Sequence, residues 1–126
     1  MNSFTITAIN PDTETGTEIV TLRGDTLFTR PFGLVILNIK EGREYFFAKH
    51  VWQKVEMGDY KKASKNANIA MNVSVDTTKY SVSAAEFDNE GNLSLSIFDE
   101  KGTVRENKWI LVFAYGSYDF VQRVKR

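Results

Sequence analysis

The chain has 126 residues, no cysteine, and 16 basic against 16 acidic side chains, so its formal net charge is zero. The absence of cysteine excludes a disulfide framework, a thiolate zinc site and a cysteine nucleophile. Zero net charge argues against a protein that binds mainly by neutralising phosphates. The length fits a single domain, residues 1–126, that can bury a core without a metal or a disulfide.

The N-terminal region alternates apolar and polar residues, which is typical of half-buried strands. Phe4, Ile6 and Ala8 alternate with serine and threonine and predict a first strand. The sequence Asn-Pro-Asp at 10–12 predicts a turn, because proline fixes φ and Asn and Asp side chains bond to their own backbone. Residues 17–23 resume the alternation, so the two segments predict a hairpin.

The next segment has two competing interpretations. Residues 33–40 are an apolar run of strand length, 41–42 (Glu-Gly) is a turn, and 43–50 is rich in β-formers, which predicts a second hairpin. The alternative is a helix over 43–57, because apolar side chains of that segment also share one helical face and Gly58 would end it. These side chains are Phe47, Ala48, Val51, Trp52 and Val55. The β-formers favour a strand at 43–50, with a helical turn after it as an option.

The second half of the chain begins with the one stretch that lacks β alternation. Over 59–68, Asp59 would cap a short helix, and an ordered loop is the alternative. Alternation then predicts strands at 69–75, 80–84, 93–97, 108–115 and 117–124. The run 109–115 is apolar on both alternating faces, so we expect a central strand that is covered on both sides.

Together these segments predict a mainly β fold. We expect a single antiparallel β-barrel or sandwich of about eight strands, with at most one or two short helices. The alternative is an α+β fold in which 43–57 is a helix packed on one face of the sheet. No internal sequence repeat is visible.

No segment carries a recognisable catalytic, metal or cofactor motif. His50 is the only histidine, and there is no His-x-x-x-His spacing and no glycine-rich phosphate loop. Residues 88–92 superficially resemble a calcium loop but lack its alternating acids and terminal glutamate, and a hairpin turn explains them. We therefore predict no enzyme, no cofactor and no metal site. An enzyme that draws a carboxylate pair from distant strands is the open alternative.

Basic and aromatic residues lie together in two parts of the chain, 52–65 and 105–126. Small β-barrels bind single-stranded nucleic acid with basic grooves and aromatic stacking platforms. Against this, the alternation places many of these aromatics in the core, and the chain as a whole is neutral, so core positions are the favoured interpretation. The candidate contact residues for a partner or a nucleic acid are Lys54, Lys61, Lys62, Arg105, Lys108, Tyr115, Tyr118, Arg123, Lys125 and Arg126.

The leading functional prediction is a non-catalytic interaction protein: an adaptor, an inhibitor or a self-associating structural subunit. Its partner would be another protein or a further copy of the chain in a homo-oligomer. The alternative is a small β-barrel that binds single-stranded nucleic acid. The N-terminus lacks a signal-peptide pattern and no apolar run is long enough to span a bilayer, so we expect a soluble, cytoplasmic protein without a membrane partner.

Overall fold

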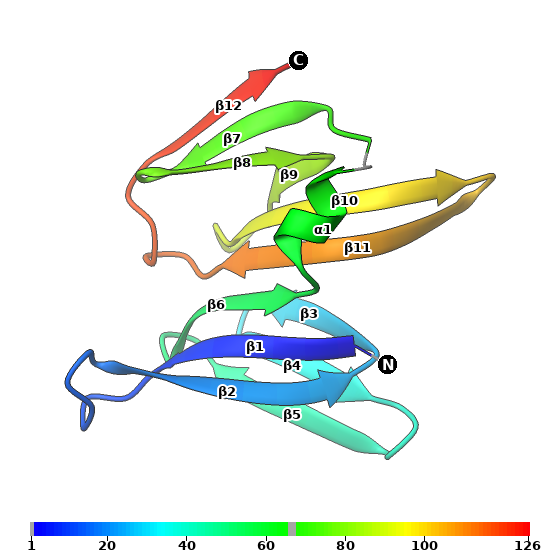
Figure 1. The fold of residues 1–126 in the computed structure, drawn as a ribbon. Helices are drawn as coiled ribbons and strands as arrows, with labels where there is room; N and C mark the ends of the chain where they lie inside the picture. The colour runs from blue at the N-terminus through cyan, green and yellow to red at the C-terminus, as the bar shows by residue number, and fades with distance from the viewer. Residues whose placement is uncertain (1, 66–67) are drawn as a thin grey trace.

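The computed structural model describes residues 2–65 and 68–126, and within them the chain forms twelve strands and one short helix (Figure 1). In chain order the elements are β1 (Asn2–Ile9), β2 (Thr17–Gly24), β3 (Thr26–Arg30), β4 (Gly33–Asn38), β5 (Arg43–Ala48), β6 (Trp52–Met57), α1 (Tyr60–Lys65), β7 (Met71–Val75), β8 (Thr78–Val82), β9 (Ala84–Phe87), β10 (Leu93–Lys101), β11 (Val104–Phe113) and β12 (Val121–Lys125). The strands make three antiparallel sheets with the orders β2-β1-β6-β11-β10-β9, β3-β4-β5 and β12-β7-β8.

The mainly β prediction is confirmed in its sandwich form, since none of these sheets closes into a barrel. The predicted number of about eight strands is wrong, because β3, β6 and β9 were missed. β9 follows β8 after the single residue Ser83, so the chain passes from one sheet into another without a glycine, proline or asparagine to mark the change. Because none of the three sheets closes on itself, each has open edge strands, and each depends on a neighbouring sheet to cover its apolar face.

The alternative of a helix over 43–57 is wrong. β5 pairs with β4, and β6 pairs with both β1 and β11. The two strands are separated by a tight connection in which His50 adopts a positive φ of 73°. β6 contains a bulge opposite Thr7 and Ala8, so Trp52 and Val55 face the same way although they are three residues apart. That spacing imitates one face of a helix.

The predicted short helix is present as α1. The side chain of Asp59 caps it, since its Oδ1 accepts a hydrogen bond from the backbone N–H of Lys61 at 3.0 Å. The Tyr60 hydroxyl accepts a hydrogen bond from the backbone N–H of Ser81 at 2.7 Å and so ties the helix to β8. Residues 66 and 67 of the predicted 59–68 stretch lie outside the described residues.

β11 is the central strand that the sequence predicted, covered on both sides. Its side chains alternate between two cores: Trp109, Leu111 and Phe113 belong to one, and Val112 and Ala114 at and just beyond its end belong to the other. The first core lies under β12-β7-β8, and the second lies under β3-β4-β5. The two small sheets therefore cover opposite faces of the long sheet, each over one half of it (Figure 1).

The twelve strands repeat one connectivity twice. In the first six, the hairpin β1–β2 is joined by β6 into the group β2-β1-β6, and β3-β4-β5 is a meander. In the last six, the hairpin β7–β8 is joined by β12 into β8-β7-β12, and β9-β10-β11 is a meander. We call β1–β6 the N-terminal unit and β7–β12 the C-terminal unit. The pairing of β6 with β11, which we call the internal joint, fuses the two units into the long sheet.

Candidate interaction surface

The outer face of the β3-β4-β5 sheet carries exposed aromatic side chains. Phe28, Val35 and Phe46 lie directly opposite one another on the three strands and so share one face. Strand alternation places this face away from the core, because neighbouring side chains such as Leu34 are fully buried in the core beneath. Phe46 is 50% exposed and Phe28 is 36% exposed.

The turn between β3 and β4 extends this face. It presents Phe32, which is 57% exposed and whose ring centroid lies 5.3 Å from that of Phe46. The guanidinium of Arg30 lies 4.8 Å from the centroid of the Phe28 ring, a cation–π contact. We call Phe28, Phe32, Val35 and Phe46 the aromatic surface. Clustered exposed aromatics mark binding sites more often than scattered ones do.

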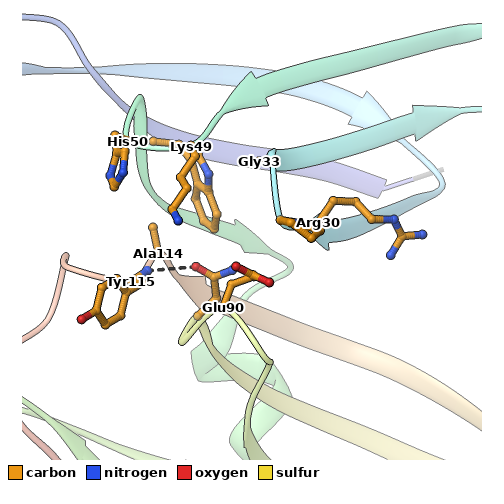
Figure 2. Close-up of a pocket in the computed structure, with 10 residues that line it drawn as sticks. Arg30, Gly33, Lys49, His50, Glu90, Ala114 and Tyr115 are labelled. Carbon is orange, nitrogen blue, oxygen red and sulfur yellow. Dashed lines mark hydrogen bonds between the residues drawn. The ribbon is translucent and has the colours of Figure 1, made fainter.

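A polar junction at one end of the aromatic surface fixes the two units to each other. Asp88, in the β9–β10 turn, accepts hydrogen bonds from the backbone N–H groups of Glu90 and Asn92 at 2.9 Å. Its other carboxylate oxygen accepts from the hydroxyl of Thr29 on β3 at 2.7 Å and from the Asn92 amide at 2.8 Å. Asn92 then accepts from the backbone N–H of Tyr115 just after β11, the dashed line in Figure 2.

The hydrogen bonds at this junction set the charge state of Asp88. Burial raises the pKa of the carboxyl, but bonds from Thr29, from the Asn92 side chain and from the Asn92 and Glu90 amides together outweigh it. The pKa of Asp88 therefore lies below its ordinary value, and the group is a carboxylate at neutral pH. This network explains residues 88–92 as a hairpin turn, as predicted.

The pocket at the junction is too small for a ligand. Figure 2 shows it between the loops that carry Arg30, Lys49 and His50 and the segments that carry Glu90 and Tyr115. Its volume is about 20 Å³, which is room for roughly one water molecule. The candidate function of this region therefore lies in its outer surface.

The structure distributes the predicted contact residues over several places. Lys61 and Lys62 lie on α1, and Lys62 and Lys108 line a cavity of about 300 Å³ beside that helix. Tyr115 and Tyr118 lie in the connection from β11 to β12. The remaining residues lie on or at the ends of strands: Lys54 on β6, Arg105 on β11, Arg123 and Lys125 on β12, and Arg126 directly after it.

Several of these residues already have partners within the chain. Arg123 donates to the backbone oxygen of Ala85 at 3.1 Å, and Arg126 donates to the side chains of Asn72 and Ser81. Arg105 lies 3.9 Å from the centroid of the Phe98 ring. Burial raises the pKa of Tyr118, helped by the nearby Tyr115 and Asp88. The structure thus brings Lys62 near Lys108 and Tyr115 near Tyr118, and it distributes the other predicted residues over separate places. Trp109 and Phe113 of the same segments are core.

Two acidic side chains line a groove of about 490 Å³, but both make local contacts. Asp25 accepts a hydrogen bond from the backbone N–H of Ile39 at 2.7 Å, and Glu106 accepts one from Lys108 at 3.1 Å. Within residues 2–65 and 68–126, no three His, Asp or Glu side chains are grouped as metal ligands would be. The same part of the chain contains no helix with the length and apolarity needed to cross a lipid bilayer.

Comparison with known proteins gives no family to set beside this geometry. No protein-family model, no curated protein and no solved structure matches the chain. Sequence reasoning missed the aromatic surface because it assigned no strand to residues 26–32, which supply two of the three phenylalanines. The sequence does hold a sign of this surface, because Phe28 and Arg30 lie two positions apart and so share one face of a strand. The strand that carries them, β3, is only five residues long, which is too short for its alternation to stand out.

Proposed function

We propose that this protein is a non-catalytic interaction protein, and specifically a self-associating structural subunit that binds through the aromatic surface. The observation that carries the proposal is the exposure of Phe28, Phe32 and Phe46 on one sheet face. Full burial of an exposed phenylalanine contributes about 1.5–3 kcal/mol, and covering these side chains, which are 36–57% exposed, would contribute the corresponding part of that free energy. A surface of this kind is stabilised by a partner that covers it. We place this role in the cytoplasm.

The mass of the protein as a function of its concentration tests the proposal. Light scattering on the full chain, from micromolar to submillimolar concentration, should give a mass that rises above that of one chain. Phe46→Ser should weaken the association about tenfold or more, because it removes a central apolar side chain from the interface. A monomer at every concentration would exclude self-association.

A matched control is available on another edge strand. Ile19 on β2 is 64% exposed, so Ile19→Ser removes a comparable exposed apolar side chain on a different sheet from the aromatic surface. We expect Ile19→Ser to associate as the unmodified chain does. If both variants lose association equally, the aromatic surface is not the interface. If the chain is a monomer but a different protein binds it and Phe46→Ser abolishes that binding, the adaptor or inhibitor role takes precedence.

A second candidate, single-stranded nucleic-acid binding, is favoured by one observation. The exposed rings of the aromatic surface lie beside Arg30 and beside Lys49, whose backbone N–H bonds to the oxygen of Phe32 at 2.9 Å. Exposed rings next to cations are the elements of a stacking platform. Titration of a labelled oligonucleotide at two salt concentrations separates the candidates, since this binding would weaken steeply with salt.

A further inference from the structure

The repeated connectivity makes β5 the counterpart of β11. Each is the last strand of its meander, and the core pairs correspond: Leu34 lies opposite Phe47 in one unit, and Leu93 lies opposite Phe113 in the other. Each phenylalanine is followed by alanine, Ala48 or Ala114. By the same correspondence β12 is the counterpart of β6, because each joins its unit's hairpin beside the first strand of that hairpin.

The internal joint uses only one member of each pair of counterparts. There β11 pairs with β6 in an antiparallel register that places Val112 opposite Val55 and Ile110 opposite Met57. The two other counterparts, β5 and β12, are edge strands of their sheets as far as the chain is described. The protein thus presents the two halves of a second joint, one on each unit.

The exposure of side chains differs between β11, which is paired in the internal joint, and its unpaired counterpart β5. On β11 the outward side chain Val112 is 3% exposed, because the β3-β4-β5 sheet of the N-terminal unit overhangs the joint and covers it. On β5 the corresponding side chain is Phe46, at 50% exposure, and the following Ala48 is exposed whereas Ala114 is buried. Phe46 of the aromatic surface therefore occupies the place at which the internal joint buries Val112 in the other unit.

We infer that β12 of a second copy of this chain pairs with β5 and that its C-terminal unit covers the aromatic surface. The inference rests on the proposed self-association and names its geometry. Such pairing joins two different edges, so it is heterologous: each copy offers β5 to one neighbour and β12 to another. Repetition of the contact gives a ring if it closes and a filament if it does not.

The charges of the two edges complement each other in this arrangement. At the internal joint, the side chains of β11 that face away from the core of the C-terminal unit lie opposite the side chains of β6 that face the core of the N-terminal unit. If β5 and β12 pair in the same way, Glu44 and Phe46, which face away from the core of their unit, lie opposite the core-facing side of β12. That side carries Val121, Arg123 and Lys125. If Phe46 lies opposite Arg123, Glu44 lies opposite Lys125; if Phe46 lies opposite Val121, Glu44 lies opposite Arg123. Both registers pair a carboxylate with a cation, whereas two β12 strands together would oppose like charges.

Single cysteine variants of the full chain test the pairing, because the chain has no cysteine of its own. Glu44→Cys is oxidised alone, Lys125→Cys and Arg123→Cys are oxidised alone, and Glu44→Cys is mixed with each of them. We expect a reducible cross-linked dimer in at least one mixture and no more than background in any variant alone. Ile19→Cys mixed with Lys125→Cys is the control, since Ile19 lies exposed on a different edge strand.

The outcomes separate this inference from the proposed function. Association by light scattering with cross-links in a variant alone, or with none in either mixture, overturns the head-to-tail pairing and leaves self-association standing. No association at any concentration overturns both. The control mixture of Ile19→Cys with Lys125→Cys measures cross-linking by random collision. A yield in that mixture equal to the yields of the Glu44→Cys mixtures would identify their cross-links as random collision and overturn the pairing.

Discussion

Asp88 concentrates more hydrogen bonds than any other side chain at the junction of the two units. Its carboxylate receives bonds from Thr29 of the N-terminal unit and from Glu90 and Asn92 of its own turn. The pair Asn92–Tyr115 continues the network to the end of β11. One carboxylate therefore determines both the shape of the β9–β10 turn and its attachment to β3.

Replacement of Asp88 by asparagine should destabilise the protein at neutral pH. Asparagine puts an N–H₂ group where a carboxylate oxygen accepts from Thr29 and Asn92, so we expect a loss of about 1–3 kcal/mol in the free energy of unfolding. The measurement is urea denaturation at pH 7. Asp12→Asn, in the exposed β1–β2 turn, is the control and should change stability by no more than about 0.5 kcal/mol.

The pH dependence of this effect has a definite sign. The folded pKa of Asp88 lies below its ordinary value, so the unfolded chain takes up the proton first as the pH falls. The stabilisation is therefore complete above about pH 4, the pKa of an unperturbed aspartate, and is lost as the pH falls through the folded pKa. The stability difference between the unmodified chain and Asp88→Asn should shrink at pH 3. A difference that stays constant from pH 7 to pH 3 would contradict this account.

The connection between β5 and β6 carries the chain from one sheet to another over three residues, 49–51. The turn is tight enough to hold His50 at a φ of 73°, in a region that disfavours side chains with a Cβ. His50→Gly should raise the free energy of unfolding by about 0.5–1 kcal/mol, even though glycine is more flexible in the unfolded chain. Thermal and urea denaturation both measure it.

A glycine in the β4–β5 turn gives the matched substitution of opposite sign. Gly42 has a φ of 64°, and a Cβ built there would meet no atom within 4 Å. Gly42→Ala should therefore destabilise by about 1 kcal/mol through the backbone alone. If His50→Gly is neutral or destabilising while Gly42→Ala behaves as expected, the His50 side chain has contacts that outweigh its backbone strain.

Strand alternation predicted most elements, and the failures have physical causes. β1, β2, β4, β5, β10 and β11 were recognised because their side chains sort cleanly between a buried and an exposed face, or are buried on both. β6 was missed because its bulge sets Trp52 and Val55 three residues apart on one face, where an unbroken strand needs two or four. A bulge is imposed by the neighbouring strand, so a pattern read along one strand does not contain it.

The candidate site was less predictable than the fold. Basic and aromatic residues drew attention to 105–126, where Trp109 and Phe113 are core and Arg123 and Arg126 bond to neighbouring strands. The aromatic surface depends on pairing between strands: Phe28 and Phe46 are 18 positions apart in the chain and are united only by lying on either side of Val35. Cross-strand register, which the sequence leaves open, creates that surface.

At the scale of the molecule, two units with the same connectivity share one strand between their cores. β11 contributes Leu111 and Phe113 to the core of the C-terminal unit and Val112 to that of the N-terminal unit. Unfolding of either unit would expose one face of this strand. The two units should therefore unfold together, although nothing in their sequences reveals the repeat.

The two tryptophans allow each unit to be followed separately. Trp52 lies in the core of the N-terminal unit at 4% exposure, and Trp109 lies in the other core at 0% exposure. In Trp109→Phe the fluorescence reports Trp52, and in Trp52→Phe it reports Trp109, while circular dichroism reports all the strands. We expect both variants to be destabilised, and within each variant we expect the fluorescence and circular dichroism midpoints in urea to coincide, as in a two-state transition.

Comparison within a variant removes the effect of the substitution itself, since both signals come from the same sample. A fluorescence midpoint that differs from the circular dichroism midpoint in either variant would mean that one unit unfolds while the other persists. The internal joint would then be a weak contact between independent units. Coincident midpoints would mean that the pairing of β11 with β6 couples the two cores. If β5 and β12 of neighbouring copies pair in the same way, association stabilises the folded chain, and the urea midpoint should rise as the protein concentration rises.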